Sequence, residues 1–120
     1  MTPNVASDVD AIRDVRCVRP SDMISLPRFA DRFGYDLARL EDLSRVPRGS
    51  LAANPFSLRT QAFMRDALEA VVLRMARSED LASAIEWFKS SALPEHGERT
   101  PEQLVADGEF HAVVRTLGAG

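Results

Sequence analysis

The stretch that decides the fold is Ser57 to Arg77, which reads SLRTQAFMRDALEAVVLRMAR. Apolar residues recur in it at three- and four-residue spacing, as on the buried face of an α-helix. The members of this face are Met64, Leu68, Val71, Val72 and Met75, with Phe63, Ala67 and Ala70 beside them. An apolar surface this wide predicts burial on more than one side. The segment is either the central core helix or the seam of a homodimer; we favour the core helix, and the two roles are compatible.

The segment after this helix carries a second helix start and then a polar loop. Ser78-Glu79-Asp80 offers a capping serine followed by two acids at the positive end of the helix dipole, which predicts that a helix begins there. Trp87 lies beside the apolar face of this helix. That face comprises Leu81, Ala84, Ile85 and Phe88. Residues 93–99 then read as an exposed polar loop.

The most specific local signature in the chain is Thr100-Pro101-Glu102-Gln103. The threonine can cap a helix, the proline fits the first helical position, and Gln103 stands where a capping box needs an amide or an acid. Asp107-Gly108 predicts the end of this helix, and a last helix is expected over residues 109–116. Gly118-Ala119-Gly120 reads as a flexible tail.

The residues before the core helix predict short helices and a loosely held arm. Residues 1–22 lack periodicity and are expected to form a flexible arm. Pro27 suits the start and Gly34 the end of a first short helix, and Asp36 can cap the next one. Residues 36–54 read as two short helices with a shared apolar seam, which is a helix-turn-helix candidate. The seam is formed by Leu40, Leu43, Val46 and Leu51.

A helix-turn-helix that reads DNA places exposed side chains of its second helix against bases and phosphates. In this chain the candidate DNA-binding side chains are Arg45, Arg48, Ser50 and Asn54. A helical hairpin that only packs has the same pattern, and two arginines make a thin basic footprint. Both interpretations stay open at this point, and we favour the hairpin that mainly packs.

Charge is distributed unevenly along the chain, whose formal net charge is -3. Residues 1–60 hold nine arginines and eight acids, whereas residues 61–120 hold five arginines, one lysine and ten acids. Affinity for nucleic acid is therefore expected only in the first half, and the acidic second half is expected to face another kind of partner. The chain has neither a long apolar run nor a signal-like start, so we expect a cytoplasmic protein without a membrane span.

The sequence offers no recognisable catalytic, cofactor or metal motif. His96 and His111 have no cysteine at ligand spacing and no histidine mate one helical turn away. Cys17 is the single cysteine, which rules out an internal disulfide, and no nucleophile–base pattern points at it. No glycine cluster fits a phosphate-binding loop. We therefore expect a protein that is not an enzyme and needs neither a cofactor nor a metal.

Four elements follow one another in a recognisable order near the C-terminus. They are Trp87-Phe88, then Arg99-Thr100-Pro101 with Leu104-Val105, then the break at Gly108, and finally Val113 through Leu117. In this order they resemble the toxin-binding domain of Xre/MbcA/ParS-type antitoxins, over residues 57–120. The helix-turn-helix candidate falls where members of that family carry a similar, often degenerate, module. The loop at 93–98 departs from the family, whose loop is tighter and rich in asparagine and glycine.

The resemblance implies a partner, namely a RES-type toxin that degrades NAD or transfers its ADP-ribose. In such pairs the antitoxin's C-terminal region covers the mouth of the toxin's NAD pocket. Carried onto this sequence, the contacts would come from the 93–100 loop and the last two helices. The side chains implied are Glu98, Arg99, Asp107, Glu109, Phe110, His111 and Arg115. A pocket for the NAD pyrophosphate has to be basic, so an acidic module would be steered toward it.

The sequence as a whole predicts an all-α protein, a small helical bundle in three parts. These parts are a flexible arm at 1–22, a helix-turn-helix-like segment at 23–56, and a helical toxin-binding domain at 57–120. The functional hypothesis is an antitoxin of a type II toxin–antitoxin system that binds a RES-type toxin and occludes its active site. The alternative is a helix-turn-helix transcriptional regulator that binds operator DNA and represses its own operon.

Overall fold

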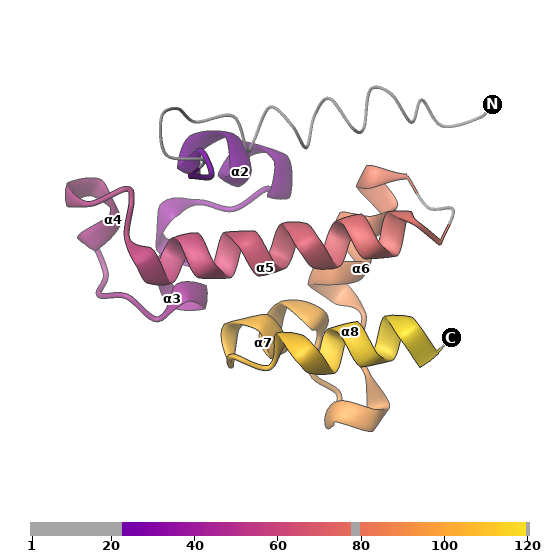
Figure 1. Cartoon of the computed structure of the whole chain (residues 1–120). Coiled ribbons are helices and arrows are strands. Elements are labelled where there is room, and N and C mark those ends of the chain that lie inside the picture. The colour runs from indigo at the N-terminus through magenta and orange to yellow at the C-terminus, as the bar shows by residue number, and fades with distance from the viewer. Residues whose placement is uncertain (1–22, 78–79, 120) are drawn as a thin grey trace. The chain divides into compact units, whose positions relative to one another are not determined.

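The computed structural model describes residues 23–77 and 80–119, and this part of the chain is all-α, as predicted (Figure 1). It forms seven α-helices, a short 3-10 turn (η1) and no strand. The elements are α2 (Leu26–Phe33), α3 (Leu37–Ser44), α4 (Ser50–Ala53), α5 (Leu58–Met75), α6 (Leu81–Ser90), η1 (Pro94–His96), α7 (Pro101–Ala106) and α8 (Phe110–Ala119). None of these helices combines the length and the hydropathy needed to cross a bilayer. The arm expected at 1–22 lies outside the described residues.

The chain divides into two compact units that meet inside α5, between Arg65 and Asp66. The N-terminal unit holds α2, α3, α4 and the start of α5, and the C-terminal unit holds the rest of α5 with α6, η1, α7 and α8. The sequence predicted a boundary between residues 56 and 57, which is in the loop that precedes α5. The long apolar helix that organises the sequence therefore contributes residues to both units.

The core of the N-terminal unit is a cluster of aromatic rings. Phe29 and Phe33 lie one turn apart on α2 and stack with their centroids 4.2 Å apart. Tyr35 stacks against both rings, and Phe63 of α5 meets Phe29 edge-on at 6.5 Å. The chain can turn from α2 back onto this cluster because Gly34 adopts a left-handed conformation, with φ 72°, that a residue with a side chain rarely takes.

Two polar contacts fix α5 to the rest of this unit. The side-chain amide of Gln61 accepts a hydrogen bond from the Ile24 N–H at 2.8 Å and donates one to the Ile24 carbonyl at 2.9 Å. The hydroxyls of Ser44 and Thr60 lie 2.8 Å apart and share a hydrogen bond. All four residues are buried, so these groups replace the water that the backbone and hydroxyls would otherwise bind.

The C-terminal unit packs α7 against both α6 and α8, and α7 and α8 lie side by side in Figure 1. Its fully buried side chains come from every helix of the unit. They are Ala67, Leu68, Ala70, Val71, Ala84, Phe88, Leu104, Ala112 and Val113. The capping box predicted at Thr100 and Gln103 is present in both directions, at 3.2 and 3.0 Å, and it fixes where α7 begins.

Two predicted helix bounds in this unit need correction. The helix start expected at Ser78 falls at Leu81, because Asp80 has the extended backbone of a cap and its carboxylate accepts from the Ser83 N–H at 2.8 Å. This hydrogen bond also lowers the pKa of Asp80. The last helix, expected to stop at Thr116 before a flexible tail, continues to Ala119. Residues 78–79 and 120 lie outside the described part of the chain.

Candidate functional site

The loop at 93–99 is exposed at most of its positions, as predicted, and its own backbone hydrogen bonds close it into a turn. Leu93 is buried, and its N–H donates to the Arg99 carbonyl at 3.0 Å. The Glu98 N–H returns to the Leu93 carbonyl at 3.0 Å, which closes the loop a second time. Gly97, with φ 70°, supplies one of the left-handed turns that this closure requires. The loop is thus held at both ends by its own backbone.

Arg99 ties this loop to the junction between α7 and α8. Its Nη1 atom lies 3.0 Å from Oδ2 of Asp107 and also forms an ion pair with Glu109. Its Nε atom donates to the His96 carbonyl at 3.1 Å. The hydrogen bonds to Glu109 and Asp107 raise the pKa of Arg99, and the hydrogen bond from Arg99 lowers the pKa of Glu109. The structure therefore brings three of the predicted site residues together, but as partners of one another.

A second contact joins the same loop to the end of α8. Nε2 of His96 lies 3.1 Å from the Thr116 hydroxyl, which also donates to the Glu95 carboxylate at 3.4 Å. Nearby, the guanidinium of Arg77 donates to the Leu117 carbonyl at 2.7 Å, so that the end of α5 is bonded to α8. Loop and last helix consequently form one connected surface within this unit.

The remaining predicted residues divide by exposure. Glu98, His111 and Arg115 are exposed, whereas Phe110 is half-buried. Sequence reasoning missed Val114, whose side chain is 38 % exposed on α8 while the adjacent Val113 is completely buried. Helical periodicity could have separated these two valines, because Val114 lies about 200° around the helix from the buried Ala112 and Val113 only about 100°. The exposed residues of the loop and of α8 together make the candidate partner-binding face.

Acid should weaken this arrangement, because the pKa of Glu109 is held below its ordinary value by the hydrogen bond from Arg99. The folded protein then binds fewer protons than the unfolded chain, so the pair contributes stability that is present above about pH 4.3 and lost as the pH falls further. We expect the Tm of the wild-type protein to fall more than that of Glu109→Gln between pH 7 and pH 3. Equal falls in both proteins would show that the pair is not coupled to folding.

The four residues considered for DNA binding lie at the turns on either side of α4 and make local contacts there. Arg48 donates to both carboxylate oxygens of Asp42 at 3.0 Å, and the hydroxyl of Ser50 donates to the Pro47 carbonyl at 2.6 Å. The other two act similarly. Arg45 ends α3 in a left-handed conformation, and the Asn54 side chain accepts from the Phe56 N–H at 3.3 Å.

The short helix α4 is positioned by a buried acid that the sequence did not single out. Glu41 is 3 % exposed, and its Oε2 atom accepts from the Leu51 N–H at 3.0 Å. This carboxylate caps the first turn of α4, whose own N-cap residue, Gly49, has no side chain for the purpose. With only the four residues of Ser50–Ala53, α4 presents a single turn to any ligand.

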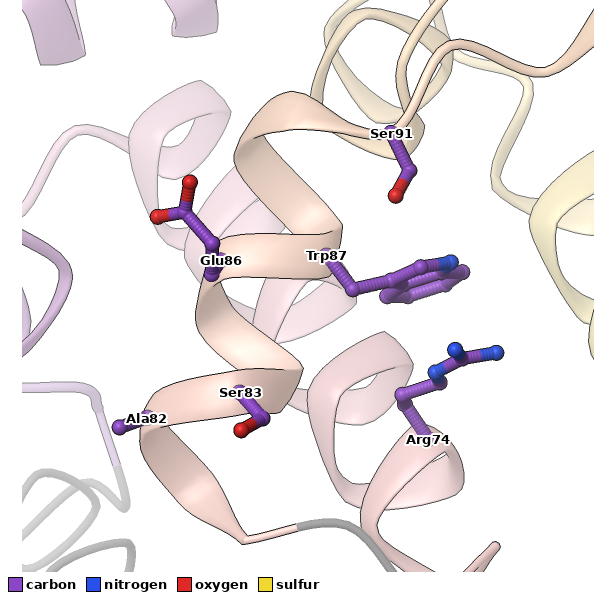
Figure 2. A pocket seen from close by; sticks show the side chains of 6 residues that line it. All are labelled: Arg74, Ala82, Ser83, Glu86, Trp87 and Ser91. Carbon is purple, nitrogen blue, oxygen red and sulfur yellow. The ribbon is translucent and has the colours of Figure 1, made fainter.

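An open pocket of about 580 Å³ lies where the last turn of α5 meets α6 (Figure 2). It is lined by Arg74, Ala82, Ser83, Glu86, Trp87 and Ser91. The guanidinium of Arg74 lies 4.9 Å from the centroid of the Trp87 ring, a cation–π contact that Figure 2 shows edge-on. Trp87 is only 9 % exposed, which fits a core side chain whose ring edge forms a wall of the pocket. No sequence motif pairs these two residues.

Among the described residues, no group of three or more His, Cys, Asp and Glu side chains is placed to hold a metal ion. The chain matches no family model, no curated protein and no solved structure. Its function therefore has to be inferred from its own residues and their geometry.

Proposed function

We propose that this protein is an antitoxin that neutralises a RES-type, NAD-consuming toxin by covering the entrance of its active site. The observation that carries the proposal is the connected surface of the loop and α8, which Arg99 holds to Asp107 and Glu109. This surface belongs to the part of the chain that resembles toxin-binding domains. A blocking protein of this kind needs an interface and no chemistry of its own.

The fixed geometry of the loop suits such a role. Association costs free energy for every side chain and loop that must be ordered on binding, so a surface that is ordered beforehand binds more tightly. Here the loop is closed by two backbone hydrogen bonds and joined to α8 through His96 and Thr116. The exposed groups of this surface include those of Glu98, His111, Val114 and Arg115, an apolar side chain among charged and polar ones. Interfaces commonly combine an apolar centre with a polar rim.

The charge of the second half of the chain also supports the proposal. Residues 61–120 carry ten acids against six basic residues. A toxin that binds NAD must offer cationic groups to the pyrophosphate, and an acidic partner approaches such a pocket faster than a neutral one. Raising the ionic strength should therefore slow the association.

The direct test is to co-express the chain with the enzyme encoded beside its gene and to purify the two together. We expect the two proteins to form a stable complex. The complex should show no NAD turnover, whereas the free toxin should show it. An interface that achieves this should bury about 1,200–2,000 Å². A chain that neither co-purifies nor protects NAD would contradict the proposal.

Replacing Val114 with aspartate is expected to weaken the complex at least tenfold. The substitution places a charge in the apolar part of the candidate partner-binding face, where it would lose water on binding without gaining a partner. Because Val114 is 38 % exposed, the fold itself should tolerate the change. The Kd of the purified complex and the NAD turnover of the toxin give the measurement.

The chain offers a matched control for this substitution. Val72 is a valine of similar exposure, 36 %, on α5 and outside the candidate partner-binding face. Val72→Asp introduces the same charge into another helix of the same unit, and its Kd should stay within about twofold of the wild type. If the two variants weakened the complex equally, the effect of Val114→Asp could not be assigned to this face. Deletion of residues 109–120 is a poorer test, because it removes the buried Ala112 and Val113.

A further inference from the structure

Glu98 occupies a backbone conformation that costs the protein stability. Its φ is 64°, in the left-handed region, which residues with a side chain rarely adopt and glycine adopts freely. The conformation is required locally, because it lets the Glu98 N–H close the loop onto the Leu93 carbonyl. Glycine would meet that requirement without strain, so the glutamate side chain is the costly feature.

Within the described part of the protein, the Glu98 side chain does not offset this cost. The Glu98 side chain is exposed, and its carboxylate makes no hydrogen bond or ion pair with any described residue. Among the described residues, Arg45 is the other left-handed residue with a side chain. It ends α3, and its N–H satisfies the carbonyls of Glu41 and Asp42, as is usual at a helix C-terminus. Strain without internal compensation is typical of positions that contact a ligand.

We propose that the Glu98 carboxylate pairs with an arginine or lysine of the partner, in the pocket where that enzyme holds the pyrophosphate of NAD. This inference rests on the proposed function and names the group that enters the pocket. A carboxylate can take the place of a phosphate oxygen against a guanidinium or an ammonium group. The closed loop holds that carboxylate at a fixed position beside α8 before the partner arrives, and the interaction with the partner offsets the strain in the loop.

The test compares three variants in the full chain, each measured alone and with the enzyme encoded beside its gene. Glu98→Gln removes the charge and keeps the shape, and Glu98→Gly removes the side chain and the strain. Glu86→Gln is the control, since it removes one charge from an exposed position on α6, outside the candidate partner-binding face. We expect both Glu98 variants to raise the Kd at least tenfold and Glu86→Gln to change it less than about twofold. Inorganic pyrophosphate should compete with the wild-type chain for the enzyme.

The stability of the variants provides an independent readout. Glu98→Gly should raise the Tm of the free protein by roughly 2–6 °C, because it relieves the left-handed strain, while Glu98→Gln should leave it unchanged. A variant that is more stable but binds less well would support the proposal, since a purely structural residue would move both quantities together. Any one of three results would overturn the proposal. They are a wild-type affinity in Glu98→Gly, an unchanged or lower Tm in that variant, and a lack of competition by pyrophosphate. In those cases the wild-type complex still forms, so the antitoxin proposal stands; absence of any wild-type complex would remove both.

Discussion

Replacing Phe29 with alanine is expected to destabilise the N-terminal unit by about 3–5 kcal/mol, the usual cost of emptying a large aromatic site in a core. Phe29 has no exposed surface and contacts the rings of Phe33, Tyr35 and Phe63, so the space it leaves has rigid walls and cannot collapse easily. Since small proteins are stable by only about 5–15 kcal/mol, the loss should be visible as a large shift of the urea midpoint followed by circular dichroism.

Leu58→Ala is the matched control for this prediction. Leu58 is 80 % exposed at the start of α5, in the same unit, and its loss should change the free energy of unfolding by less than about 0.5 kcal/mol. A loss below about 1 kcal/mol for Phe29→Ala would mean that the aromatic cluster is not the centre of this core. It would also contradict the packing described for α2.

Replacing Gln61 with leucine is expected to cost about 2–4 kcal/mol, although leucine is apolar and the site is buried. The change leaves both the N–H and the carbonyl of Ile24 without their partner, and an unsatisfied buried backbone group costs about 1–3 kcal/mol. The Ile24 amide should exchange its hydrogen faster in the variant, which separates this cause from a general loss of packing. Arg65→Gln, at an exposed position one turn along the same helix, should leave both the stability and that exchange rate unchanged.

The helices were largely predictable because they depend on local signals. The cap at Asp36, the capping box at Thr100 and the glycine stop at Gly34 each involve residues no more than four positions apart. The errors at α6 and α8 have the same origin. Ser78 and Asp80 both fit a cap by residue type, and only the backbone decides between them, while a glycine-rich end such as 118–120 gives no local signal that a helix continues.

The candidate site was only partly predictable, because its residues meet through contacts that sequence spacing does not specify. The family resemblance implied contacts from the 93–100 loop and the last two helices, but it did not indicate that Arg99, Asp107 and Glu109 bind one another. Periodicity alone could not indicate that Arg74 lies over Trp87. Nor does the sequence indicate that Glu98 has a left-handed backbone. The neighbouring Gly97 is the residue that would be expected to adopt this conformation, and both residues do.

The placement of Trp87 in the wall of the Arg74 pocket has a practical outcome for anyone who studies this chain. It is the single tryptophan, and Tyr35, the single tyrosine, is buried among the phenylalanines around α2. Each unit thus carries one intrinsic fluorophore of its own. Emission excited selectively from the indole reports on the C-terminal unit, the tyrosine signal reports on the N-terminal one, and a comparison of the two melting curves shows without any label whether both units unfold in one cooperative step.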